Sequence, residues 1–308
     1  MQVTSDRDPA TLAAFAAAVV IGGMNFIAVK FSNEELDPLS GAAIRFASAA
    51  LLLFAIVALW RYPLPRGRAA MGAAIYGLLG FGVSYAFLYY AIEGLGAGTT
   101  SGFVAATPLA TLLLAIAHKQ EKLTARGLLG GLLAVAGIVL LSVRSFETDL
   151  ELSYLVAVIL GVVSIAESGV VIKAYPSPHP MSTNAVGMAA GALFLIVASF
   201  AFSATWEMPT EAKTWGALAW LVVMGSVALF WLFLYVIARW TASATAYVVT
   251  LMPVVAITLG VLVADEELTP ELVVGAVVVL IAVWIGALSG PRREVKAMEV
   301  APAEAGTS

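Results

Sequence analysis

Long apolar stretches separated by short polar connections run through almost the whole chain. Each stretch reaches about 20 residues, which is long enough for a helix to cross the hydrocarbon core of a bilayer. The apolar residues are continuous and do not alternate with polar ones, so the pattern excludes a transmembrane β-barrel. It predicts an all-α integral membrane protein with ten transmembrane helices. The predicted segments are 10–30, 38–60, 69–93, 97–117, 124–143, 152–173, 180–203, 213–237, 241–264 and 270–289.

Composition agrees with this fold and removes several classes of function. With 61% hydrophobic and 12% charged residues, the chain has no room for a separate soluble domain. It contains no cysteine, which excludes disulfides and thiolate metal sites. The chain has no basic patch with interleaved aromatic residues, so we do not expect nucleic acid as a partner. The first apolar segment lacks the cleavage site of a signal peptide, and we expect it to be retained.

The distribution of lysine and arginine residues predicts the orientation in the membrane. If the N-terminus is cytoplasmic, twelve of these residues fall on the inner side and three on the outer side. Because inner loops carry the excess of positive charge, we expect both termini to be cytoplasmic, in a bacterial inner membrane. The inner residues are Arg7, Arg61, Arg66, Arg68, Lys119, Lys122, Arg126, Lys173, Arg239, Arg292, Arg293 and Lys296, and the outer residues are Lys30, Arg144 and Lys213.

A block of sequence in the first half recurs 145 residues later without a gap, and the charges around the two copies are reversed. Reversed charge is expected if the two halves insert in opposite directions. Chance similarity between apolar helices is the alternative, which the ungapped agreement disfavours. We predict two inverted five-helix repeats, 1–146 and 147–290, and a disordered cytoplasmic tail, 291–308. The matched pairs are Gly80 and Gly225, Pro108 and Pro253, Glu121 and Glu266, Leu123 and Leu268, Thr124 and Thr269, and Gly130 and Gly275.

The repeated motif resembles that of the EamA-type transporters of the drug/metabolite transporter superfamily. In that family each five-helix half has a proline within a helix, a Glu-x-Leu-Thr-like turn and a following glycine. The start of the chain is similar too, from Gly22 to Lys30 and at Pro38 and Arg45, although Gly22-Gly23 replaces the family's Trp-Gly. The resemblance implies ten helices around a central cavity, with segments 124–143 and 270–289 peripheral. It also implies export or exchange of small metabolites, often amino acids.

Two prolines lie deep inside predicted segments and at matched positions, Pro108 and Pro253. A proline lacks an N–H group and leaves the carbonyl four residues earlier without its helical partner, here Val104 and Val249. Freed carbonyls and a kink in the middle of the bilayer can line a cavity or form a hinge. Prolines are also tolerated in membrane helices as packing kinks, but the matched positions favour a hinge in each half.

Few ionisable residues lie inside the predicted segments, and each is a candidate because a charge in hydrocarbon is costly. Arg45 would bind a substrate carboxylate or, alternatively, extend to the outer interface. Glu167 would titrate if protons drive export, or would instead fix helix packing through a hydrogen bond or ion pair. Lys30 and Lys173 end matched helices, where they would act in gating or as interfacial anchors.

Polar and aromatic residues complete the predicted substrate site. The four aromatic candidates form two pairs at a spacing of four residues, so each pair shares one helix face. Aromatic walls suit an aromatic or amphipathic solute, while an interfacial aromatic belt is the alternative explanation. These candidates are Asn25, Ser84, Tyr85, Tyr89, Trp231 and Tyr235.

The expected function is export of small metabolites by alternating access, with neutral or aromatic amino acids as the main candidates. Within the family the alternative is a proton-coupled exporter of drugs or nucleosides, and outside it a membrane receptor or assembly factor. An intramembrane enzyme is disfavoured, because the chain has no His-Glu-x-x-His motif, no intramembrane Asp pair and no cysteine. We expect a small-molecule substrate and the lipid bilayer as partners, no cofactor or metal, and a functional monomer.

Overall fold

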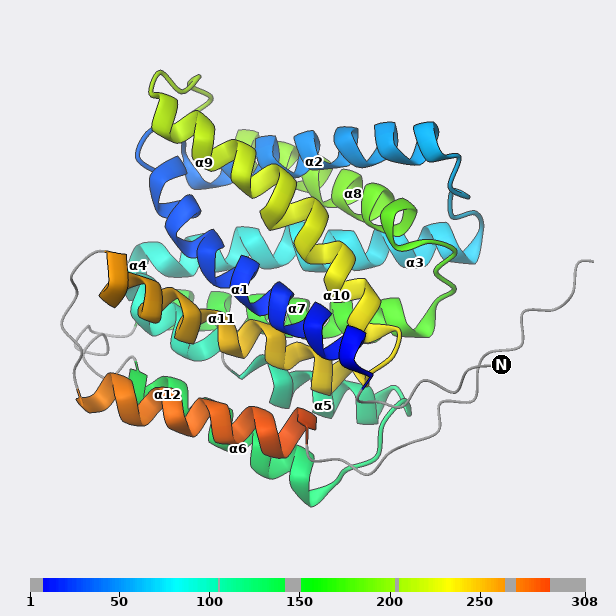
Figure 1. The fold of residues 1–308 in the computed structure, drawn as a ribbon. Helices are drawn as coiled ribbons and strands as arrows, with labels where there is room; N and C mark the ends of the chain where they lie inside the picture. Colours follow the sequence, from blue (N-terminus) through cyan, green and yellow to red (C-terminus); the bar gives the residue numbers. More distant parts are fainter. Residues whose placement is uncertain (1–7, 105, 142–150, 203–204, 264–269, 289–308) are drawn as a thin grey trace, which may run out of the picture.

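The computed structural model describes residues 8–104, 106–141, 151–202, 205–263 and 270–288, and these form helices and short connections without any strand (Figure 1). The first half contains α1 (Pro9–Ser32), α2 (Pro38–Trp60), α3 (Arg68–Gly77), η1 (Leu78–Val83), α4 (Ser84–Val104), α5 (Thr107–Ala117) and α6 (Ala125–Leu141). The second half contains α7 (Leu152–Ala174), α8 (Pro180–Ala201), α9 (Ala212–Val222), η3 (Val223–Ala228), α10 (Leu229–Ile237), α11 (Ala242–Val263), α12 (Pro270–Val283) and η4 (Trp284–Leu288).

Six helical stretches among the described residues are long and apolar enough to span a membrane. They are Pro9–Ser32, Pro38–Trp60, Arg68–Ala91, Leu152–Ala174, Pro180–Ala201 and Ala212–Ile237. Four shorter apolar helices fall within the remaining predicted segments, and these are Thr107–Ala117, Ala125–Gly137, Ala242–Ala256 and Val273–Leu288. The prediction of an all-helical fold with membrane-length apolar helices is confirmed for this part of the chain, while the count of ten crossings stays a prediction.

The boundary between the third and fourth predicted segments differs in the structure. Residues 94–96, expected to connect two helices, lie inside the continuous helix α4. This helix ends at Val104, and α5 begins at Thr107 with Pro108 in its first turn. The predicted position of Pro108 in the middle of a helix is therefore wrong, while its role as a hinge stays a prediction. The Thr107 hydroxyl donates to the Val104 carbonyl, the group that the proline was expected to leave unpaired. Pro253, in contrast, lies inside α11 as predicted.

Two π-helical turns occupy the same position in both halves. The first, η1, separates α3 from α4, and the second, η3, separates α9 from α10. Adding 145 to the residue numbers of η1 gives those of η3, which is the spacing of the sequence repeat. π-turns are rare and are frequently found at functional sites. The repeat is therefore present in the backbone itself, in a feature that apolar composition alone does not require.

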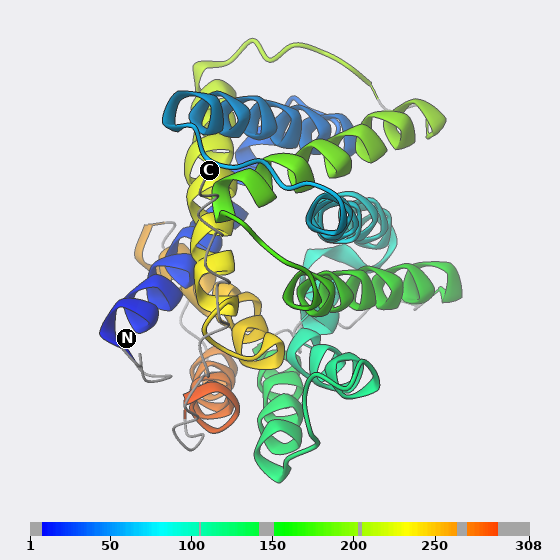
Figure 2. The same cartoon turned by 90° about the vertical axis from the view of Figure 1, so that its right-hand side faces the viewer.

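Equivalent helices of the two halves pack against one another. α2 lies along α8, α5 along α11 and α6 along α12. The α6–α12 pair lies at one edge of the molecule (Figures 1 and 2), where the resemblance placed the peripheral segments. Its helices approach closely because glycines face the contact: a Cβ on Gly137 would lie 2.7 Å from Val279 Cγ2 and 3.1 Å from the Gly275 carbonyl oxygen.

The Glu-x-Leu-Thr turn of the first half also contacts the second half. The Glu121 carboxylate accepts hydrogen bonds from the amide and the hydroxyl of Ser243, at the start of α11. Thr124 caps its own helix by accepting a hydrogen bond from the Gly127 amide at 3.1 Å. A carboxylate at a helix N-terminus binds amides that have no partner within the helix. Glu266, the counterpart of Glu121, lies outside the described residues.

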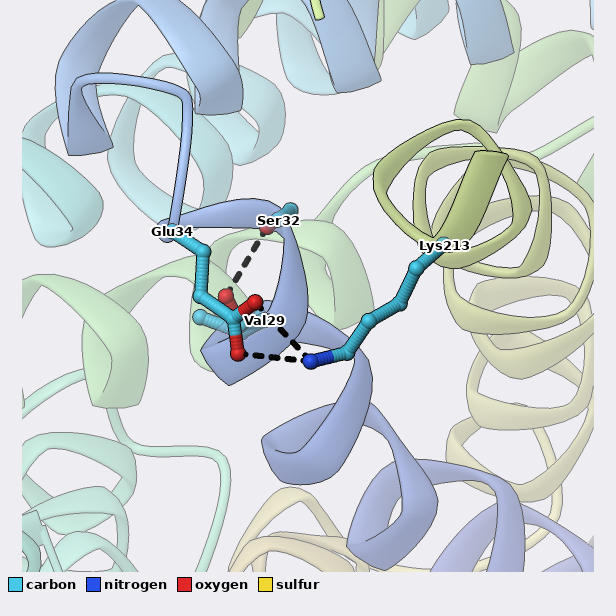
Figure 3. Close-up of polar contacts among 4 residues, drawn as sticks. All are labelled: Val29, Ser32, Glu34 and Lys213. Carbon is cyan, nitrogen blue, oxygen red and sulfur yellow. Dashed lines mark hydrogen bonds and ion pairs between the residues drawn. The ribbon is translucent and has the colours of Figure 1, made fainter. Parts of the chain in front are cut away.

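The connection between α1 and α2 is held to the start of α9 (Figure 3). Glu34 forms an ion pair with Lys213, with 2.8 Å between the carboxylate oxygen and Nζ. Glu35 accepts hydrogen bonds from the backbone amides of Thr210 and Glu211, just before α9 begins. Hydrogen bonding, above all from the Thr210 hydroxyl, lowers the pKa of Glu35 from 4.5 to about 2. A charged side chain of the first half thus holds the N-terminus of a helix of the second half.

Candidate functional site

Arg45, near the start of α2, is buried inside the protein, with 3% of its surface exposed. Its Nε donates to the Ser226 hydroxyl at 2.9 Å, and its Nη2 donates to the Gly225 carbonyl at 2.7 Å. Both acceptors belong to η3, about half the chain away in sequence. The alternative that Arg45 extends to the outer interface is therefore wrong, because its side chain points to another helix instead.

The carbonyl that Arg45 binds is available because η3 is a π-helix. In a π-turn each backbone N–H donates to the carbonyl five residues earlier, and in an α-helix to the carbonyl four residues earlier. Where the π-turn returns to the α-helix, one carbonyl is left without a backbone donor of its own helix. In the first half the equivalent carbonyl belongs to Gly80, which accepts a hydrogen bond from the Ser84 hydroxyl at 2.8 Å. The second half has Leu229 at the position of Ser84, and Arg45 and Asn25 donate to the carbonyl instead. Ser84 therefore uses its hydroxyl within its own helix.

Asn25, on α1, binds the same carbonyl as Arg45 and is also buried. Its Nδ2 lies 3.2 Å from the Gly225 oxygen. A Cβ on Gly225 would lie 2.3 Å from Asn25 Oδ1, so the Asn25 side chain occupies the space that a side chain at position 225 would need. The other half repeats this relation, because a Cβ on Gly80 would lie 3.0 Å from the hydroxyl of Ser168 on α7. The first helix of each half therefore packs on the π-helix of the other half.

Aromatic rings lie beside the Arg45 guanidinium. Its Cζ is 5.0 Å from the ring centre of Phe46 and 5.9 Å from that of Tyr85, distances at which a cation is attracted to a ring. Tyr85 packs edge-on against Phe46 and contacts Tyr89, with 5.9 Å between the ring centres of the two tyrosines. The structure thus brings four predicted candidates together. We call them, with their contacts, the Arg45 cluster: Asn25, Arg45, Phe46, Tyr85, Tyr89, Gly225 and Ser226.

The two aromatic candidates on α10 form a separate group. Trp231 and Tyr235 contact each other, with ring centres 6.2 Å apart, and Trp231 lies on the exposed face of α10. Arg239 covers the Tyr235 ring, with its Cζ 3.5 Å from the ring centre. An exposed tryptophan and a tyrosine under a cation favour the interfacial belt over the substrate wall. The neighbouring Phe230 packs edge-on against Phe81, which in turn contacts Phe46 of the Arg45 cluster, with 5.1 Å between the ring centres of Phe46 and Phe81.

Glu167, on α7, pairs with His118 at the end of α5, with 3.0 Å between Oε1 and Nε2. The other carboxylate oxygen, Oε2, is buried and has no hydrogen-bond partner among the described residues. The Glu167 side chain is 22% exposed and that of His118 is 44% exposed. This pair joins α5 to α7.

The two lysines at matched helix ends have different surroundings. Lys173 donates to the carbonyls of Ile237 and Trp240, at the C-terminal end of α10. A cation at this position stabilises the helix dipole and satisfies carbonyls that have no partner within the helix. Lys30 is exposed at the end of α1. Lys173 thus links α7 to α10, and the gating role of both lysines stays a prediction.

Several members of the site were not among the predicted residues. Ser226 and Phe46 contact Arg45 directly, and His118 pairs with Glu167. One usable signal was the match of Gly80 with Gly225 in the repeat, since glycines at matched positions often mark close packing. Within the described ranges, no group of three or more His, Asp or Glu side chains lies close enough to hold a metal ion.

Comparison with known proteins gives matches over most of the chain. The model of a family described as the EamA-like transporter family matches residues 9–143 and again 152–287. The chain is 28% identical to the uncharacterized inner membrane transporter YedA of Escherichia coli K12 over 257 residues, or 82% of each chain. It is 31% identical over 129 residues, 40% of each chain, to a probable amino-acid metabolite efflux pump of the same organism. A solved crystal structure shares the fold, with a TM-score of 0.76 at 16% identity, and the match covers 91% of this chain and 97% of that one.

Proposed function

Because this chain belongs to the EamA-like transporter family, we propose that it exports small metabolites by alternating access and that neutral and aromatic amino acids are its substrates. The family and the named relatives are transporters and not enzymes, so the chain is a membrane transporter. Two matches of the family model in one chain agree with the recurrence of the π-helices. The substrate class is the part of this proposal that needs support from the site.

The observation that carries the substrate class is the burial of Arg45 without an anion beside it. A buried guanidinium is costly unless it is paired and fully hydrogen-bonded. The two hydrogen bonds of Arg45 go to neutral acceptors, and in the described part of the chain no carboxylate lies within ion-pair distance of it. A guanidinium matches the planar geometry of a carboxylate. A solute carboxylate would therefore complete this site.

The rings of the Arg45 cluster support a solute with an apolar side chain. Phe46, Tyr85 and Tyr89 offer broad apolar contact with few polar groups, which suits aromatic and neutral side chains. The relative described as a probable amino-acid metabolite efflux pump supports the same class, although it matches only 40% of this chain. Amino acids combine a carboxylate with such a side chain.

Arg45→Gln is expected to lower phenylalanine flux in proteoliposomes about tenfold or more, since a hydrogen bond to a charged group contributes about 1.5–3 kcal/mol. Arg45→Lys keeps the charge and should keep part of the flux. Flux is measured per folded transporter. Phenylalaninamide has no carboxylate, so wild type and Arg45→Gln should move it equally poorly. Equal phenylalanine flux in wild type and Arg45→Gln would contradict the proposal.

The proposal includes the arrangement in the membrane. It comprises ten crossings, two five-helix repeats inserted in opposite directions, both termini in the cytoplasm, and a monomer in a bacterial inner membrane. The pairing of α2 with α8, of α5 with α11 and of α6 with α12 supports a twofold relation between the halves. The excess of lysine and arginine on one side supports the orientation. The relative from Escherichia coli is described as an inner membrane transporter.

The alternative of proton-coupled export rests on Glu167, whose buried Oε2 has no hydrogen-bond partner among the described residues. We favour facilitated export or exchange, because few carboxylates lie within the helices. Glu167→Gln is therefore expected to keep full flux, with or without a pH gradient across the proteoliposome membrane. His118→Gln is the matched control, because it removes the imidazole of the same contact and keeps the carboxylate. If a pH gradient drives wild-type flux and Glu167→Gln alone abolishes this effect, proton coupling is the correct mechanism.

A further inference from the structure

The two halves pack differently at matched places. α3 of the first half contacts α8 of the second half through backbone atoms. A Cβ on Gly77 would lie 1.8 Å from the Gly187 carbonyl oxygen. One turn further along α8, a Cβ on Gly191 would lie 2.8 Å from the Gly77 carbonyl oxygen. η1 continues this contact along α8. Gly77 is the last residue of α3 and Gly187 lies about two turns into α8. Both helices begin toward the right in Figure 1, and we call this side of the contact the glycine end.

The matched place in the other half holds Arg45 instead of a glycine. α8 and α2 align at a spacing of 142, which matches Pro180 with Pro38 and Leu195 with Leu53, and therefore Gly187 with Arg45. Here the Arg45 side chain lies between α2 and η3. α9 and η3 contact α2 much less extensively than α3 and η1 contact α8. The first turn of α9 lies toward the left in Figure 1, and we call this the arginine end.

We propose that Arg45 is a positioning residue that holds the arginine end apart while the glycine end is closed. Its guanidinium fills the space between α2 and η3, and its bonds to Gly225 and Ser226 keep η3 at that distance. For α9 and η3 to close on α2, this side chain has to leave. Val222 is at the position of the second half that matches Gly77. When the arginine end closes, side chains and not backbone atoms therefore come into contact.

The same geometry couples closure to the solute, a step that rests on the proposed function. A carboxylate is a stronger acceptor for a guanidinium than a neutral carbonyl is. A bound carboxylate therefore competes with the Gly225 carbonyl for Arg45 and loosens the contact that keeps η3 in place. Arg45 is at the arginine end, and glycines form the contact at the other end. A solute carboxylate that binds Arg45 therefore acts directly on the arginine end only.

Spin-label distances test the proposal, because the chain has no cysteine of its own. Leu39→Cys with Gly216→Cys places labels at the start of α2 and α9, and Met181→Cys with Met71→Cys places them at the matched positions of α8 and α3. Without solute, Arg45→Gly is expected to shift the 39–216 distribution to shorter distances. Arg45→Lys, which can still donate to Gly225, should keep the wild-type distribution. The 71–181 distribution shows whether each variant is folded.

The outcomes separate the two parts of the inference. If the 39–216 distribution of folded Arg45→Gly equals that of wild type, Arg45 does not hold this end apart and the proposal is overturned. Saturating phenylalanine is expected to shorten the 39–216 distance in wild type and to add nothing in Arg45→Gly. If Arg45→Gly shortens the distance and phenylalanine does not, the positioning role stands and the proposed substrate class is wrong.

Discussion

Gly77→Ala is expected to separate α3 from α8 and to lower the melting temperature of the purified protein. The added methyl group would lie 1.8 Å from the Gly187 oxygen and 2.3 Å from its Cα, and these backbone atoms cannot rotate away. Overpacking typically costs about 1–3 kcal/mol, and a backbone contact belongs at the upper end of this range. We expect a decrease of about 5–10 °C, together with a longer distance between labels at positions 71 and 181.

Gly216→Ala is the matched control for this substitution. Gly216 also lies in a membrane helix, α9, but nothing comes within 4 Å of a Cβ built there. Alanine favours a helix over glycine, so this variant should melt at the wild-type temperature or slightly above it. If Gly77→Ala behaves like Gly216→Ala in both melting and label distance, the backbone contact between α3 and α8 does not exist in the membrane.

Gly225→Ala is expected to lower transport about tenfold while leaving most of the protein folded. Its methyl group would lie 2.3 Å from Asn25 Oδ1, and a side chain can move where a backbone cannot. Moving Asn25 breaks its bond to the carbonyl that Arg45 shares, and a lost buried hydrogen bond costs about 1–3 kcal/mol. The measurement is flux per folded transporter in proteoliposomes.

Gly80→Ala tests whether this effect is specific to the Arg45 cluster. Gly80 holds the matched position in η1, and its added methyl group would lie 3.0 Å from the Ser168 hydroxyl, a milder contact. Its carbonyl accepts a hydrogen bond from Ser84, which bonds within its own helix, and from no residue of the Arg45 cluster among the described residues. We expect a smaller loss of flux than for Gly225→Ala. Equal losses would show that both glycines serve helix packing alone.

The helices and their repeat could be predicted because both depend on local pattern. Apolar runs determine which segments enter a bilayer. The matched residues of the two halves gave a spacing of 145 residues, and η1 and η3 are separated by the same spacing. The π-turns themselves could not be predicted. One extra residue in a helical turn requires no special residue type and barely changes the apolar period. Only the glycine pair Gly80 and Gly225 indicated that this position was unusual.

The environment of Arg45 could not be read from its own segment. Depth in the predicted helix allowed both a buried side chain and one extended to the interface. The difference came from η3, whose π-turn supplies a carbonyl without a helical partner. The position of Pro108 in the middle of a helix was wrong for a similar reason, since the prediction assumed a continuous helix. In the structure α4 ends at Val104, and the Thr107 hydroxyl donates to the Val104 carbonyl.

The hydrogen bonds that Glu35 accepts also keep this carboxylate charged in mild acid, because they lower its pKa. A lowered pKa means that the stabilisation is complete above the usual value of 4.5 and disappears only as the pH falls through about 2. Glu35 therefore stays charged, and the connection between α1 and α2 stays attached to α9, in any mildly acidic medium on its side of the membrane. The joint between the first half and the second therefore keeps these hydrogen bonds over a wider range of pH than an ordinary carboxylate would allow.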